Sequence, residues 1–76
     1  MKELVTHIIK SLVDNPDKIE VIEINGEKSL ILEVKVAEED RGKVIGKEGR
    51  IIKSIRTIVS SAAAKIDKRT SVELIE

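Results

Sequence analysis

The chain has 76 residues, the length of one domain, and contains no Phe, Tyr, Trp or Cys and one His. This composition argues against aromatic base stacking, disulfides, cysteine metal sites and histidine-based catalysis, so we expect no enzyme, no metal and no cofactor. The formal net charge is zero, but residues 1–40 carry five Lys and ten acids, whereas residues 41–69 carry nine Lys and Arg against two acids. Such a basic segment is either a solvated face or a surface that contacts phosphate.

The first 25 residues predict a helix followed by a strand. Apolar residues recur at helical spacing through residues 2–14, and the helix should end before Pro16. Residues 19–24 favour a strand, but the alternation slips between Val21 and Ile22, which leaves open a bulge or a change of buried face.

A hairpin and a second strand are predicted next. Asn25-Gly26 is a turn signal because both residues tolerate positive φ. Residues 29–36 alternate cleanly, with four apolar side chains on one face and Ile31 on the other. This pattern is typical of an antiparallel strand with one buried face.

Two helices and a strand complete the chain. Three acids at residues 38–40 favour a short helix that ends near residue 45, and Gly42 inside it suggests that something packs close to its backbone. Residues 50–66 predict the longest helix, and Val72 and Leu74 belong to a final strand. The buried stripe of the long helix is expected to consist of Ile52, Ile55, Val59, Ala62, Ala63 and Ile66. The order α-β-β-α-α-β predicts an α+β fold, a three-stranded sheet with three helices packed on one face.

The most informative feature is the glycine turn, Gly46-Lys47-Glu48-Gly49, which lies between the two helices within the basic segment. It does not fit a Walker A loop, which needs G-x-x-x-x-G-K-[ST], nor the dinucleotide fingerprint G-x-G-x-x-G. Glycines at a turn that opens a helix allow a sugar-phosphate backbone to approach the main chain closely. The alternative is a purely structural link between helices.

The turn and its context resemble the KH domain family. The stretch Ile45-Gly46-Lys47-Glu48-Gly49-Arg50-Ile51-Ile52 matches the family signature I-G-x-x-G-x-x-I. The α-β extension precedes the core, which is similar to the type II, prokaryotic form. The resemblance covers the whole chain and implies a single KH domain at 1–76, with a core at 29–76 and an N-terminal extension at 1–26.

The resemblance implies a binding site for single-stranded RNA at the glycine turn. In KH domains this turn clamps the backbone of about four nucleotides. The implied contact residues are Lys43, Val44, Gly46, Lys47, Glu48, Gly49, Arg50, Lys53 and Arg56. The bases are expected in an aliphatic groove between the short helix, the turn and the second strand, lined by Val44 and Ile31. Ile45 and Ile52 are expected to anchor the turn to the core.

The resemblance also implies a cellular role and partners. The implied partner is a second copy of the chain, in a homodimer, or a larger KH-containing protein of the Jag type (KhpB), in a heteromer. The implied role is that of an RNA chaperone or post-transcriptional regulator in cell elongation and peptidoglycan homeostasis. The apolar runs are too short to span a bilayer and the N-terminus lacks a signal-peptide core, so we expect a cytoplasmic protein. The alternative function is a KH-fold interaction module that dimerises, with RNA binding secondary; Ile31, Ile51 and Ile58 are candidate surface residues for it. Binding of single-stranded DNA also stays open.

Overall fold

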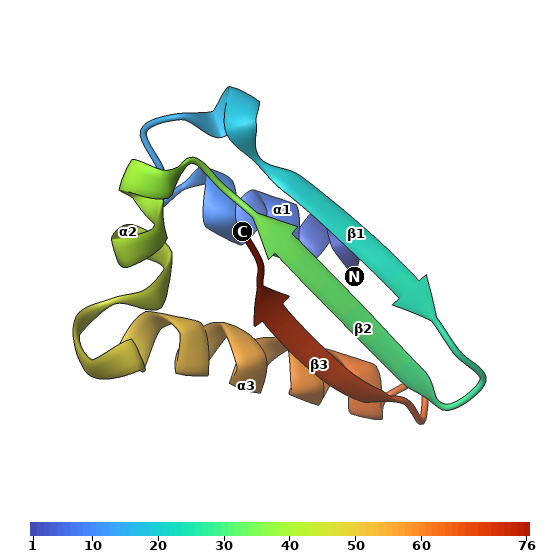
Figure 1. Cartoon of the computed structure of the whole chain (residues 1–76). Coiled ribbons are helices and arrows are strands. Elements are labelled where there is room, and N and C mark those ends of the chain that lie inside the picture. The colour runs from blue at the N-terminus through green and yellow to red at the C-terminus, as the bar shows by residue number, and fades with distance from the viewer.

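The chain forms the predicted order of helices and strands. In a computed structural model that describes residues 1–76, the elements are α1 (Lys2–Lys10), β1 (Glu20–Asn25), β2 (Ser29–Lys35), α2 (Arg41–Ile45), α3 (Arg50–Ala64) and β3 (Arg69–Leu74) (Figure 1). Short 3₁₀ turns lie at Pro16–Lys18, Glu38–Asp40 and Lys47–Gly49. The α+β class and the α-β-β-α-α-β order are confirmed.

The sheet is mixed and has the strand order β1-β2-β3. β1 runs antiparallel to β2, and β3 runs parallel to β2 with Ser29 opposite Arg69. The β1–β2 register pairs every residue in turn, so no bulge occurs between Val21 and Ile22. Val21 faces the helices and is buried, whereas Ile22 is 39% exposed and lies toward the other face of the sheet.

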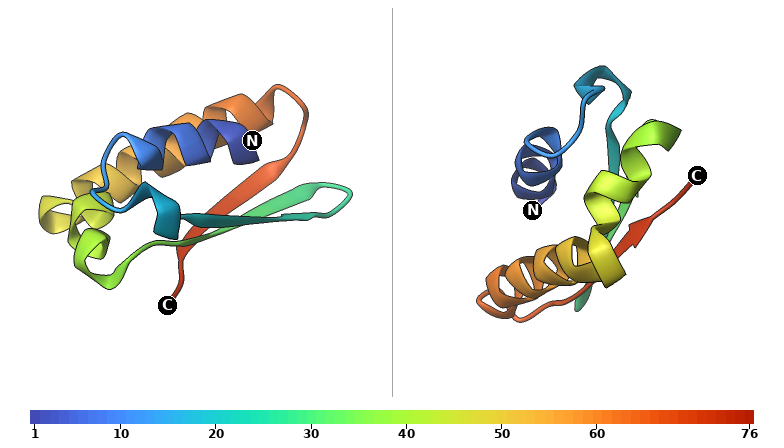
Figure 2. Two further views of the ribbon diagram at one scale, coloured as in Figure 1. Left: turned by 90° about the horizontal axis from the view of Figure 1, so that it is seen from above. Right: turned by 90° about the vertical axis from the view of Figure 1, so that its left-hand side faces the viewer.

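Two of the helices cover one face of the sheet. α1 contacts β1, α3 contacts β3, and the two helices also touch one another. Figure 2 shows both on the same side of the sheet, while α2 lies beyond the end of β2 and leads into α3. A parallel strand pair needs a long crossover, and α2 with α3 supplies it.

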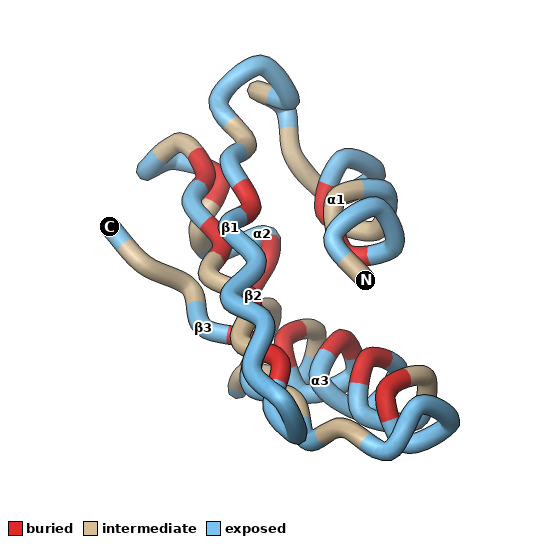
Figure 3. Tube along the Cα trace, turned by 90° about the vertical axis from the view of Figure 1, so that its right-hand side faces the viewer, coloured by how far each residue is buried: buried red, intermediate tan, exposed pale blue.

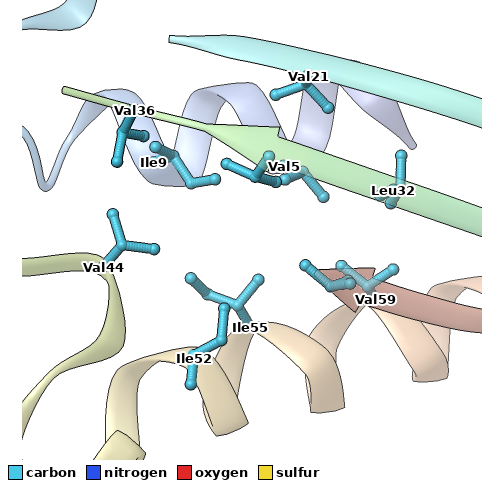
Figure 4. Packing of buried hydrophobic residues seen from close by; sticks show 11 residues of the cluster. Val5, Ile9, Val21, Leu32, Val36, Val44, Ile52, Ile55 and Val59 are labelled. Atoms are coloured by element: carbon cyan, nitrogen blue, oxygen red, sulfur yellow. The ribbon is translucent and has the colours of Figure 1, made fainter. Parts of the chain in front are cut away.

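The core is entirely aliphatic and draws on every helix and strand. Figure 3 shows the buried positions on the sides of α1 and α3 that face the sheet, and Figure 4 shows the packing of their side chains. The cluster consists of Val5, Ile9, Val21, Leu32, Val34, Val36, Val44, Ile52, Ile55, Val59 and Val72. The predicted inward face of β2 is confirmed, because Leu30, Leu32 and Val34 are buried.

The ends of the helices differ from the sequence prediction. α1 stops at Lys10, and the next residues form a turn in which the Leu12 and Val13 amides still bond to the Ile9 carbonyl. α3 stops at Ala64 because Asp67 adopts a left-handed conformation with φ 57° and the amides of Asp67 and Lys68 bond back to the helix. The prediction that Ile66 is buried was therefore wrong: it is 59% exposed, beyond the helix end.

Candidate nucleic-acid interface

The glycine turn departs from helical geometry at three of its four residues. Gly46 has φ 77° and ψ 174°, Glu48 has φ 58° and ψ 25°, and Gly49 has φ 74° and ψ 15°. The amide of Gly46 bonds to the carbonyl of Gly42 at 2.9 Å, which closes α2, and the amide of Gly49 bonds to the Gly46 carbonyl at 3.2 Å. These positive φ angles turn the chain sharply from α2 into α3.

The two glycines have different surroundings. A Cβ placed on Gly46 would meet the side chain of Ile51, whereas one on Gly49 would have no heavy atom closer than 3.9 Å. Gly46 therefore lies tightly against Ile51, whereas Gly49 has ordinary van der Waals distances to Ile52 and Lys53. The start of α3 follows directly, where the Gly49 amide donates to the Gly46 carbonyl and a further amide donates to the Lys47 carbonyl. The exposed middle of the turn, Lys47 and Glu48, thus lies beside the positive end of α3.

The cations nearest the turn are exposed. Lys47 and Lys53 make no ion pair within the protein, and both are exposed. Arg50 lies 3.7 Å from the Glu48 carboxylate, with side-chain exposures of 78% and 69%. An ion pair so exposed is weak and readily exchanged for a phosphate. The structure therefore leaves Lys47, Arg50 and Lys53 available to an anionic ligand.

Lys43 is in a different situation, because its ammonium group is already paired. It contacts the Asp14 carboxylate directly and lies 3.5 Å from Oδ1 of Asp40. The hydrogen bond to Asp14 is the main reason why the pKa of Lys43 is raised, and both carboxylates add to it. Lys43 thus ties α2 to the connection between α1 and β1.

Asp40 is the only charged residue that is fully buried. Burial acts to raise the pKa of its carboxyl, but hydrogen bonds from the Asn15 side chain and from the amides of Asp14 and Asn15, together with Lys43, outweigh burial and lower the pKa. Sequence reasoning placed Asp40 only as a favourable charge at a helix start. Nothing in the sequence pattern signals that residues 14 and 15 would fold back onto it.

The two side chains expected to line an aliphatic groove do not share a surface. Val44 is completely buried in the core, so its side chain cannot touch a surface ligand, and this corrects its expected role. Ile31 lies on the opposite face of the sheet from the helices, since its neighbours Leu30 and Leu32 point into the core. Ile45 and Ile52 do pack on the core, beside the turn.

A shallow hollow lies instead between α3 and the edge strand β3. It is lined by Arg56, Ser60, Thr70, Ser71, Val72 and Glu73. The Nε group of Arg56 donates to the Val72 carbonyl at 3.1 Å, which fixes the guanidinium at the strand edge. Arg56 therefore lies on the side of α3 that faces this hollow, and nothing in the sequence pattern indicated that β3 would form its wall.

Other kinds of site find no support in these residues. No cluster of three or more His, Cys, Asp or Glu side chains is placed to hold a metal ion. None of the helices combines the length and the apolar character that crossing a bilayer requires.

A Gly-x-x-Gly turn between two helices, packed on a mixed three-stranded sheet behind an N-terminal α-β extension, is the arrangement of a type II KH domain. KH domains clamp single-stranded nucleic acid at this turn. The family model described as "KhpA/KhpB, KH domain" matches residues 2–74, and the chain therefore belongs to this family.

Curated relatives cover the chain from end to end. The chain is 60% identical over 75 residues to "RNA-binding protein KhpA" of Clostridium acetobutylicum, which spans 99% of this chain and 100% of the relative. The protein of the same name from Caldanaerobacter subterraneus is 61% identical with the same coverage. That of Aquifex aeolicus is 46% identical over 76 residues, or 100% of this chain and 96% of the relative.

Proposed function

We propose that the protein binds single-stranded RNA and holds its backbone at the glycine turn. The observation that carries this proposal is the exposed middle of the glycine turn, Lys47 and Glu48, which lies at the start of α3 among three exposed cations. The names of the relatives support RNA as the ligand class. No step of this function is catalytic.

The proposed contacts fall into two groups. The first group contacts phosphate and consists of the glycine turn and the residue after it: Gly46, Lys47, Glu48, Gly49 and Arg50. Glu48 contributes its backbone only. Lys53 and Arg56 continue the contact along α3 toward the β3 edge. We leave Val44 out because it is buried, and we assign Lys43 a supporting role because it is paired with two carboxylates.

Binding by one such domain is expected to be modest. The chain has no aromatic side chain on which a base could stack, and each stacked base is worth about 1–3 kcal/mol in proteins that use stacking. The Glu48 carboxylate also competes with phosphate for Arg50. We therefore propose that a partner assists binding. The family resemblance implies the identity of that partner, a larger KH-containing protein (KhpB). It also implies the role that we propose here: a cytoplasmic RNA chaperone or post-transcriptional regulator in cell elongation and peptidoglycan homeostasis.

The test replaces both middle residues of the turn. The variant Lys47→Asp with Glu48→Asp should lose binding to a fluorescent single-stranded RNA while its circular dichroism stays that of the folded protein. Lys18→Asp is the matched control, since it changes the net charge equally at an exposed residue of a distant turn. Equal affinities of the two variants would rule out the glycine turn as the site. A DNA oligomer of the same sequence separates RNA from DNA binding.

A second candidate function is a protein-interaction module. Of the three candidate isoleucines, Ile58 on α3 is 48% exposed, whereas Ile31 and Ile51 are only partly exposed. Leu4 on α1 and Ile66 just beyond α3 are 37% and 59% exposed. Single exposed apolar side chains are common on protein surfaces, and a contiguous patch of them would suit a homodimer or a heteromer. Light scattering with and without RNA tests this candidate: a stable complex that RNA neither requires nor displaces would make interaction the primary role.

A further inference from the structure

We propose that Asp40 is a positioning residue for the glycine turn. Its buried carboxylate fixes the start of α2 against the connection between α1 and β1, and this sets the direction in which Gly46–Gly49 faces the ligand. The inference rests on the proposed RNA binding at that turn.

The hydrogen-bond donors around the Asp40 carboxylate come from two segments of the chain. Its carboxylate accepts hydrogen bonds from the amide of Asp14 at 3.2 Å, the amide of Asn15 at 3.0 Å and Nδ2 of Asn15 at 3.0 Å. These three donors belong to the connection between α1 and β1. The fourth donor is Lys43 at 3.5 Å, which lies within α2 itself. Asp40 thus joins the N-terminal extension to the helix that carries the turn.

α2 needs such an attachment because it has only five residues. A helix of this length is not stable in isolation and depends on tertiary contacts. Its placement depends on Asp40 before its first residue, on Arg41, whose guanidinium donates to the Ile75 carbonyl at 2.9 Å, and on Val44 in the core. Gly46 follows the last residue of α2 directly, so a rotation of α2 would turn Gly46–Gly49 with it.

An electrostatic effect and a positioning effect of Asp40→Asn would change RNA affinity in opposite directions. Asp40→Asn removes a negative charge, which by electrostatics alone would strengthen the binding of a polyanion. It also replaces a carboxylate that accepts from three donors of the connection with an amide that offers one acceptor oxygen and faces those donors with its own N–H groups. Positioning therefore predicts weaker binding. Glu38→Gln is the matched control, because it removes an equal charge from the same short turn at an exposed side chain with no hydrogen bond.

The experiment uses the full chain and a fluorescent oligouridine of about eight nucleotides, twice the length that one KH turn contacts. Fluorescence anisotropy should show Asp40→Asn binding about fivefold or more weakly than the wild type. Glu38→Gln should bind equally or more tightly. The ¹H–¹⁵N resonances of Gly46 and Gly49 should shift in Asp40→Asn and stay in place in Glu38→Gln, at a temperature where circular dichroism shows both variants folded.

Two results would overturn the inference: equal affinity of both variants, or unchanged glycine resonances in Asp40→Asn. If Asp40→Asn does not fold, Asn15→Ala replaces it, since this variant removes one donor and keeps the carboxylate and its charge; unchanged affinity and resonances would then refute positioning. If the wild type itself does not bind oligouridine, the proposed function fails, and the glycine resonances alone decide whether Asp40 orients the turn.

Discussion

The side chain of Ile51 occupies the space that a Cβ on Gly46 would need. Such a Cβ would lie 2.5 Å from Cγ1 of Ile51 and 2.9 Å from its Cβ. Gly46 also combines φ 77° with ψ 174°, a region of backbone space that essentially only glycine occupies. Backbone conformation and side-chain packing therefore both require glycine at position 46.

Gly46→Ala should lower the free energy of unfolding by about 2–4 kcal/mol, the sum of backbone strain and a steric clash. Gly42→Ala is the control within the same helix: it is exposed and a Cβ there would meet nothing within 4 Å, so helix propensity should raise stability by about 0.5–1 kcal/mol. Urea unfolding measures both variants. A Gly46→Ala protein as stable as Gly42→Ala would contradict the described packing of Ile51.

Asp67 closes α3 in a left-handed conformation that glycine adopts at lower cost. It has φ 57°, and the amide of Lys68 bonds to the Ala63 carbonyl at 3.1 Å, as in a Schellman motif. Asp67→Gly should therefore raise the free energy of unfolding by about 0.5–1 kcal/mol, and Asp67→Ala should lower it by a similar amount. Thermal unfolding of the pair gives the order, and a less stable glycine variant would be inconsistent with this helix end.

We expect Lys43 to stabilise the fold and Lys53 to contact the RNA. Lys53→Gln removes a free cation, so RNA affinity should fall and the slope of log K against log salt should become shallower by about 0.7. Lys43→Gln leaves Asp14 and Asp40 without their cation, so it should lower the melting temperature and change the salt slope little. Titrations at several salt concentrations test both. Equal slopes in the two variants would contradict the assignment.

The acid side of the stability curve should depend on Asp40. Its pKa in the folded protein lies below the ordinary value of 3.8, so its ionised form stabilises the fold above that pH, and the contribution is lost as pH falls through the lower folded pKa. The melting temperature of the wild type should exceed that of Asp40→Asn at pH 6, and the difference should shrink below about pH 4. A difference that stays constant down to pH 2 would show that ionisation of Asp40 does not contribute.

Periodicity and turn chemistry predicted most of the fold. Alternation in β2, the Asn25-Gly26 hairpin and the apolar stripe of α3 are local patterns, and each element formed where its pattern lay. The glycine turn was equally predictable, because the residue types that favour positive φ and the start of the next helix are adjacent in the sequence. The clean face of β2 even gave the correct inward side chains, among them Leu32 and Val34.

The errors concern contacts between segments far apart in the chain. Val44 was expected to line a ligand groove next to the turn, but at the end of α2 it lies in the core. Gly42 suggested close packing and has open space instead. The pairing of Lys43 depends on Asp14, and the partners of Asp40 depend on residues 14 and 15. No local pattern encodes these long-range pairs, and they decide which cations are free to meet a ligand.

The parallel pairing of β2 with β3 has a consequence for the order of folding. The two strands are separated in the sequence by α2 and α3, yet Ser29 pairs with Arg69 and Val34 with Leu74. The entropy lost in bringing such distant segments together must be overcome before their hydrogen bonds form. We therefore expect the β2–β3 pairing, and with it the support of α3, to form late in folding.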